Sequence, residues 1–291
     1  MPNVTANGIQ IEYDTFGDDS SQALLLIIGA GGQMIYWELE FCESLAKRGL
    51  FVIRFDNRDA GLSTKFDEAG IPDMMAAMEG KPVDAAYSLD DMAADAVGLL
   101  DALGIQKAHI CGSSMGGEIA QIISYRYPER VLSLTSIMSS TGNPELPQMK
   151  PEVLAAVFKP VPAEREAHIE HNVNLWRMLW SPGFPFDEKR LRRVLAEGYD
   201  RSYYPPGMIR QSLAVLKNGY RKLLIASIEA PTLIIHGDED PLMSVEGGKE
   251  MAHLISGAKL LIVNGMGHDM PKEAWPKIID AIYNHTMEAS V

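Results

Sequence analysis

A serine stands at the centre of a G-x-S-x-G pentapeptide, Gly112-Ser113-Ser114-Met115-Gly116. The residues before it, 108–111, have the pattern of a buried strand, and residues 115–127 that of a helix. In this strand–turn–helix context the turn is strained and raises the serine hydroxyl above the edge of the sheet. The helix N-terminus adds free N–H groups and partial positive charge. We therefore predict that Ser114 is a nucleophile, the alternative being an ordinary turn.

A serine hydroxyl needs a general base, and the base needs an acid to orient it. In the strand–turn–helix architecture the acid and then a histidine follow the serine along the chain. His268 follows two closely spaced glycines, Gly265 and Gly267, after a mostly apolar segment, residues 259–263. It is the one histidine of seven with the right order and position. We predict His268 as the base, the alternative being a loop histidine bonded to the backbone.

The acid is expected after the preceding strand-like segment, residues 232–235. The residues that follow contain Asp238, Glu239 and Asp240 in succession. We favour Asp240, because it reaches past the strand end and precedes a proline that fixes the turn. Asp238 is the alternative acid, and its other interpretation is a residue that caps a helix or turn. Residues 139–143, where some proteins of this architecture place the acid, contain none.

An acyl-transfer site also needs two N–H groups aimed at the developing oxyanion. The N–H of Met115, next after the serine, is the first candidate. The second is expected in the loop Gly29-Ala30-Gly31-Gly32, where glycines let the backbone approach a substrate. We predict Ala30 as the donor, with Gly31 as the alternative and as a substrate contact.

Strand-like and helix-like segments alternate around these residues, which predicts a mostly parallel sheet with helices on both faces. The expected strands are residues 23–28, 50–55, 108–111, 131–138, 232–235 and 259–263. The expected helices are residues 37–48, 88–103, 115–127 and 272–287. An Asn7-Gly8 pair predicts a hairpin at the start. Ligands bind at the carboxyl edge of such sheets, where all the residues above would meet.

Residues 143–225 interrupt this alternation with nine prolines and helical stretches but no strand pattern. We expect an α/β core of residues 1–142 and 226–291 and a helical cap, residues 143–225, inserted over the sheet edge. Trp176 and Trp180 are four residues apart, hence on one helix face, and Phe184 is nearby. They suggest an apolar substrate pocket suited to hydrophobic esters. The alternative is that they pack the cap onto the core.

The composition excludes several other classes. The 291 residues carry 26 basic and 39 acidic side chains, a formal charge of −13, which argues against a nucleic-acid or membrane partner. Two cysteines exclude a disulfide framework and a cysteine-built zinc site, and we expect no metal. The start of the chain lacks the features of a secretory signal, so we expect a cytoplasmic protein. The oligomeric state stays open, a homodimer being one alternative.

Together these motifs resemble the α/β-hydrolase fold superfamily over nearly the whole chain. The matching stretches are residues 24–29 with Trp37, 54–63, 112–117, 236–241 and 265–268. Residues 56–63 and the cap stretch 176–187 are most similar to bacterial esterases of the aclacinomycin methylesterase type. The resemblance implies a helical cap, no cofactor, and a Ser-His-Asp site made of Ser114, His268 and Asp240. One departure is Ile28-Gly29, where many members have His-Gly.

The sequence therefore predicts a serine hydrolase that cleaves carboxylic esters of hydrophobic small molecules through an acyl-enzyme. A C–C bond hydrolase, lactonase or perhydrolase would keep the same triad, and so could a slow-turnover ligand receptor. Dehalogenases and epoxide hydrolases of this fold carry aspartate where Ser114 stands. A dinucleotide-binding loop is excluded, because the third glycine of G-x-G-x-x-G would fall at Met34.

Overall fold

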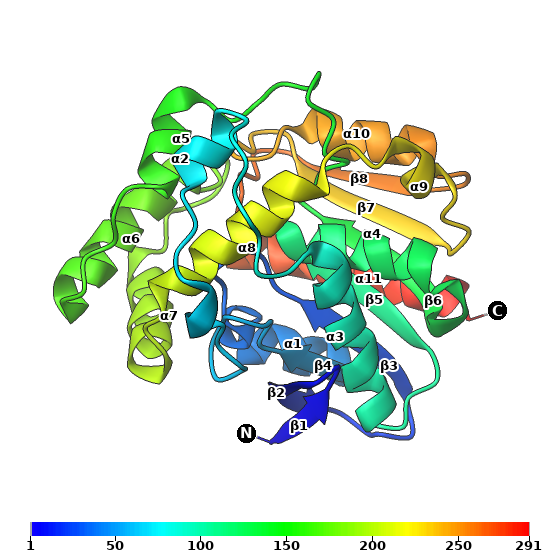
Figure 1. The fold of residues 1–291 in the computed structure, drawn as a ribbon. Helices are drawn as coiled ribbons and strands as arrows, with labels where there is room; N and C mark the ends of the chain where they lie inside the picture. The colour runs from blue at the N-terminus through cyan, green and yellow to red at the C-terminus, as the bar shows by residue number, and fades with distance from the viewer. Residues whose placement is uncertain (1, 291) are drawn as a thin grey trace.

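The computed structural model describes residues 2–290 and contains one eight-stranded sheet (Figure 1). The strand order is β1-β2-β4-β3-β5-β6-β7-β8. β2 is antiparallel to both of its neighbours, β1 and β4, and all the other neighbouring strands are parallel. The strands are β1 Asn3–Ala6, β2 Ile9–Phe16, β3 Gln22–Ile27, β4 Leu50–Phe55, β5 Ala108–Ser113, β6 Val131–Ile137, β7 Thr232–Gly237 and β8 Lys259–Val263. The predicted mostly parallel sheet is confirmed.

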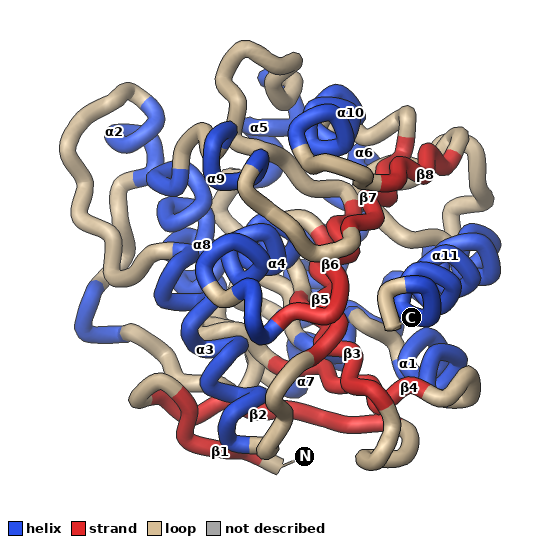
Figure 2. The backbone as a smooth tube through the Cα atoms, turned by 90° about the vertical axis from the view of Figure 1, so that its right-hand side faces the viewer, coloured by secondary structure: helices blue, strands red, loops and turns tan. Residues whose placement is uncertain are grey.

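Helices cover both faces of the sheet, as Figure 2 shows for α1 and α11 on one side and α3 and α4 on the other. The helices are α1 Leu39–Ala46, α2 Met74–Met78, α3 Leu89–Ala102, α4 Met115–Arg126, α5 Pro151–Val157, α6 Arg165–Leu179, α7 Glu188–Arg201, α8 Pro205–Asn218, α9 Lys222–Ala226, α10 Val245–Leu254 and α11 Trp275–Glu288. Short 3-10 turns span Met34–Tyr36, Asp67–Ala69, Pro128–Arg130 and Lys272–Ala274. This double cover explains why the central strands are continuous apolar runs.

Two apolar cores lie on the two faces of the sheet. One core includes residues of α3, α4 and α10, and the other includes residues of α1 and α11. β5 is buried at every position, since it lies between both layers. At the sheet edge, Asn7 and Gly8 adopt φ angles of 48° and 78° and close the predicted hairpin.

The cap helices α5 to α8 lie between β6 and β7 in sequence and at one end of the sheet in space (Figure 1). Ile169, Val173 and Leu195 form a small core of their own between α6 and α7. The predicted boundary between residues 225 and 226 falls within α9, whose Ile225 is buried in the core shared with α3 and α4. α9 thus packs on the body of the molecule.

The predicted elements differ from the observed ones mainly at their ends. β5 extends to Ser113, which pairs with Ile137 of β6, so the strand runs up to the turn at Ser114. α1 begins at Leu39, after the 3-10 turn at Met34–Tyr36. Ser88 caps α3 with Asp91 in a reciprocal capping box. No helix within residues 2–290 is long and apolar enough to cross a membrane.

Candidate active site

Ser114 occupies a strained turn between β5 and α4. Its φ of 55° and ψ of −125° are rare for a residue with a side chain, and its N–H donates to the carbonyl of Ile137 at 2.9 Å. The turn depends on glycine at two positions. A Cβ at Gly112 would lie 1.9 Å from the carbonyl oxygen of Gly116, and one at Gly116 would lie 2.1 Å from that of Ile27. Close backbone packing therefore holds the turn in its strained conformation.

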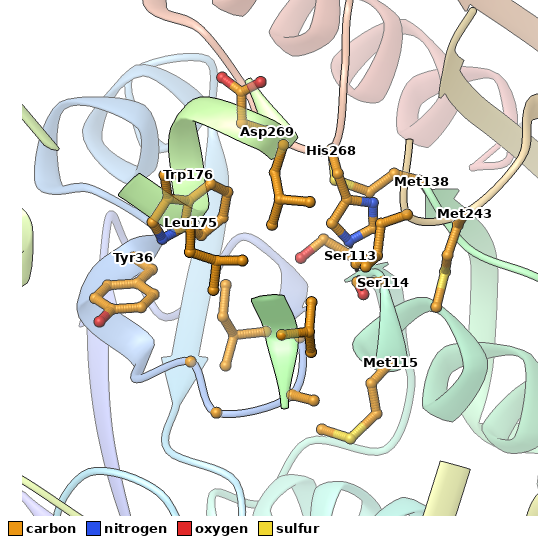
Figure 3. Close-up of a pocket in the computed structure, with 18 of the residues that line it drawn as sticks. Tyr36, Ser113, Ser114, Met115, Met138, Leu175, Trp176, Met243, His268 and Asp269 are labelled. Carbon is orange, nitrogen blue, oxygen red and sulfur yellow. Dashed lines mark hydrogen bonds between the residues drawn. The ribbon is translucent and has the colours of Figure 1, made fainter. Parts of the chain in front are cut away.

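The structure brings Ser114, His268 and Asp240 together in one hydrogen-bonded chain. His268 Nε2 lies 3.1 Å from Ser114 Oγ, and His268 Nδ1 lies 2.8 Å from Asp240 Oδ2. The residues follow β5, β7 and β8, so the parallel sheet brings three distant segments to one edge. Figure 3 shows the His268 ring directed toward Ser114.

Asp240 is fixed and charged in this arrangement. Its side chain is fully buried, and Oδ1 accepts backbone N–H groups of Leu242 and Met243 at 2.9 and 2.8 Å. Burial would raise the pKa of this carboxyl, but nearby His268 and His236 hold the pKa well below its usual range. The alternative acid, Asp238, accepts the N–H of Gly265 at 2.6 Å and braces that loop instead.

The loop after β3 lies against Ser114. A Cβ at Gly29 would be 3.1 Å from Ser114 Cβ. The N–H groups of Ala30 and Met115 have no hydrogen-bond acceptor in the part of the chain that the structure describes, whereas the N–H of Gly31 donates to Gln211 Oε1 at 2.7 Å. Of the two residues that the sequence offered as second donor, Ala30 has its N–H available and Gly31 does not.

The cap helices hold this loop. Gln211 of α8 is fully buried, and its Nε2 donates to the carbonyl of Arg58 at 2.7 Å while its Oε1 accepts from Gly31. On the same loop, Gln33 Nε2 donates to the carbonyls of Gly198 and Ser202 at 2.6 and 3.0 Å. The predicted oxyanion loop is therefore joined directly to the cap.

The histidine loop is joined to the cap as well. The N–H of His268 donates to the carbonyl of Leu179 at 2.8 Å, at the end of α6. Ser181 Oγ accepts the N–H of Gly267 at 2.8 Å and donates to Asp269 Oδ1 at 2.6 Å. Both loops that flank Ser114 thus depend on the cap for part of their hydrogen bonding.

A cavity of about 710 Å³ opens beside Ser114, between the cap and the sheet edge (Figure 3). Of the residues predicted to contact substrate, Gly31, Trp176 and Trp180 line this cavity. Phe184 is not among the lining residues and packs against the core that includes α1 and α11. Eight of the sixteen methionines line the cavity: Met74, Met78, Met115, Met138, Met149, Met208, Met243 and Met270. Such side chains can adapt to bulky apolar ligands.

Sequence reasoning missed Gln211 and two charged lining residues, Glu38 and Arg190. No local pattern marks them. Glu38 follows Trp37 at the start of α1, Arg190 lies on an arginine-rich stretch of α7, and only the docking of the cap brings them together.

Comparisons with known proteins agree with the fold. The profile of a family described as "alpha/beta hydrolase fold" matches residues 22–274. Rhodomycin D methylesterases of Streptomyces peucetius and Streptomyces sp. strain C5 are 29% and 30% identical, over 99% of this chain and 98% of each relative. A 2-hydroxymuconate semialdehyde hydrolase of Pseudomonas putida is 29% identical over 75% of this chain and 76% of its own.

Among solved structures, a meta-cleavage product hydrolase of Pseudomonas fluorescens superposes with a TM-score of 0.78 at 24% identity, covering 99% of this chain and 98% of that one. At this identity the likeness concerns the fold. The strand order, the strained serine turn and the matched family profile lead to one conclusion: the chain belongs to the α/β-hydrolase fold family.

Proposed function

We propose that the protein is a serine hydrolase that cleaves carboxylic esters of hydrophobic small molecules. The observation that carries the proposal is the chain from Asp240 through His268 to Ser114, with distances of 2.8 and 3.1 Å, beside a large apolar cavity. A nucleophile, a base and an orienting acid in this order are the groups that acyl transfer needs.

In the first half-reaction His268 Nε2 accepts the Ser114 proton as Oγ attacks the ester carbonyl. The resulting oxyanion accepts the N–H groups of Ala30 and Met115, each such donor being worth about 2.7–4 kcal/mol in the transition state. His268 then donates its proton to the leaving alcohol, and the acyl group stays on Ser114. Asp240 remains a carboxylate and stabilises the imidazolium.

In the second half-reaction water takes the place of the alcohol. His268 accepts a proton from water, whose oxygen attacks the acyl carbonyl, and the same two N–H groups bind the second oxyanion. Collapse of this intermediate releases the carboxylic acid, and His268 returns the proton to Ser114 Oγ. Trp176, Trp180 and the lining methionines would hold the apolar parts of the substrate.

The full-length similarity to methylesterases supports ester cleavage as the reaction. A second candidate is hydrolysis of a C–C bond, which the similarity to 2-hydroxymuconate semialdehyde hydrolase supports over three quarters of the chain. That reaction needs the same nucleophile and base but a carbon leaving group. The two candidates differ in the substrate that they turn over.

The test is hydrolysis of p-nitrophenyl acetate, butyrate and octanoate by the wild-type protein and by Ser114→Ala. We expect kcat/KM to rise with chain length, because the cavity is large and apolar, and to fall by at least about 10⁴-fold in the variant. Ser124→Ala, on the same helix α4 but outside the cavity, is the matched control. Folded wild-type protein without turnover, or equal turnover by Ser114→Ala, would contradict the proposal.

A further inference from the structure

Few charged side chains line the cavity. Apart from the proposed base His268, the aspartate, glutamate, lysine and arginine side chains lining it within residues 2–290 are Glu38, Arg190 and Asp269. Arg190 offers the one positive charge with which an anionic substrate group could pair. The cavity can therefore accept an anion only if the guanidinium of Arg190 is not already paired with another group.

Arg190 is engaged on several sides. Its Nε donates to Glu38 Oε1 at 2.5 Å, and its Nη2 donates to the carbonyl of Met270 at 3.4 Å. The guanidinium carbon lies 4.9 Å from the ring centre of Trp275. The side chains of Arg190 and Glu38 are only 15% and 10% exposed, so water screens the pair weakly. The pair is a neutral unit at the cavity wall.

The partner of Arg190 is itself held in place. Glu38 Oε2 accepts Nη2 of Arg193 at 2.9 Å. Arg193 is 57% exposed and does not line the cavity, so it fixes Glu38 while water screens the extra positive charge that it brings. Glu38 cannot turn away from Arg190 without breaking this second ion pair.

The remaining acidic side chain of the lining, the Asp269 carboxyl, is neutral or negative. Burial raises its pKa to about 6, so most of it is ionised above pH 7. Figure 3 shows its carboxylate directed away from Ser114. With the Glu38–Arg190 pair neutral and Asp269 acidic, the lining holds no net positive charge, and an anionic group placed there would lose its hydration without gaining a cation.

We propose that Glu38 determines specificity by engaging Arg190, and that it restricts the site to esters whose acyl and alcohol parts carry no negative charge. This inference rests on the proposed esterase function and names its substrate class. The same arrangement favours release of the product, because hydrolysis turns a neutral ester into a carboxylate that finds no free cation in the cavity.

The experiment compares two substrates of equal chain length, methyl 4-nitrophenyl suberate and 4-nitrophenyl hydrogen suberate, which ends in a carboxylate. We expect wild-type kcat/KM to favour the neutral diester by about 100-fold, since an unpaired carboxylate in the site costs several kcal/mol. In Glu38→Gln the amide oxygen can still accept from Arg190, but the guanidinium charge is no longer neutralised. We expect the preference to fall by about tenfold.

Two controls separate this effect from general damage. Glu40→Gln removes a carboxylate two residues away that is 68% exposed and pairs with Lys272 outside the cavity, and the preference should stay at the wild-type value. Adding Arg190→Gln to Glu38→Gln removes the freed cation and should restore the preference. Any loss of activity common to both substrates cancels in the ratio.

A binding measurement keeps the inference independent of turnover. In Ser114→Ala, quenching of the cavity tryptophans gives Kd for naphthalene-1-acetamide and naphthalene-1-acetate, and Glu38→Gln on this background should reduce the preference for the amide. The inference is overturned if the protein with Glu38 intact hydrolyses or binds the neutral and the anionic compound equally well. It is also overturned if folded Glu38→Gln keeps the same preference for the neutral compound. If no ester cleavage depends on Ser114, the proposed function is overturned instead. The Kd values for the amide and the acetate then test the charge preference without any turnover.

Discussion

Replacing Gln211 by leucine tests whether the cap positions the oxyanion loop. The substitution removes the acceptor of the Gly31 N–H and the donor to the Arg58 carbonyl, each bond being 2.7 Å long. Gln211 is fully buried, so the Arg58 carbonyl loses its partner away from water, whereas Gly31 is exposed and its N–H can bond to water instead. An unsatisfied buried group costs about 1–3 kcal/mol, and we expect the free energy of unfolding to fall by about 1–3 kcal/mol.

The catalytic effect follows from the neighbouring residue. Ala30, the proposed oxyanion donor, precedes Gly31 and moves with it. Complete loss of one such donor costs about 10²–10³ in kcat. Because Gln211→Leu displaces the donor without deleting it, we expect kcat for p-nitrophenyl octanoate to fall by about 10–100-fold, with KM changed by less than about threefold.

The assay is steady-state hydrolysis with the folded fraction measured by circular dichroism. Gln211→Glu keeps an oxygen for the Gly31 N–H and should recover much of the lost kcat. Gln121→Leu is the matched control, since Gln121 is another fully buried glutamine that accepts a hydrogen bond from Arg221 and lies outside the cavity. A folded Gln211→Leu with wild-type kcat would refute the positioning role.

Three further predictions concern stability and the histidine loop. The folded-state pKa of Asp269 is raised, so its burial destabilises the protein as pH rises from about 4 through 6. Between pH 4 and pH 8 the free energy of unfolding, measured with urea, should fall by up to about 3 kcal/mol less in Asp269→Asn than in the wild type. The same fall in both proteins would count against this prediction. Gly112→Ala, whose Cβ would lie 1.9 Å from the Gly116 carbonyl oxygen, should cost more than about 4 kcal/mol, and a wild-type melting curve would be inconsistent with that contact. Ser181→Ala loosens the loop of His268 and should lower kcat by about tenfold with KM little changed. A larger effect on KM than on kcat would assign Ser181 to substrate binding instead.

The elements of the sheet and the residues at its edge could be predicted because their signals are local. Residues 23–28 are an apolar run and residues 108–111 are mostly apolar, and each segment is followed by glycine, which is the pattern of a strand covered on both faces. The positions of Ser114 and His268 then follow from parallel topology, since β5 and β8 run in the same direction and end at the same edge.

The contacts made by the cap could not be predicted, because they depend on how distant helices dock. Gln211 stands on α8 in a stretch without a chemical motif, and its role arises only where it meets the loop of Gly31. Phe184 was expected in the cavity from its closeness in sequence to Trp180. The chain leaves the helix at Trp180 in an extended conformation, with a ψ of 156°, and Phe184 then packs against the core that includes α1 and α11.

The most direct test of the account is to trap the covalent intermediate. Rapid quenching of the wild-type protein with p-nitrophenyl octanoate, followed by peptide mass spectrometry, should place one octanoyl group on Ser114. The group should be absent from Ser114→Ala and strongly reduced in His268→Ala, because the base that activates the hydroxyl is then missing. An octanoyl group on another residue, or turnover without any acylated protein, would contradict the assignment of Ser114 as the nucleophile.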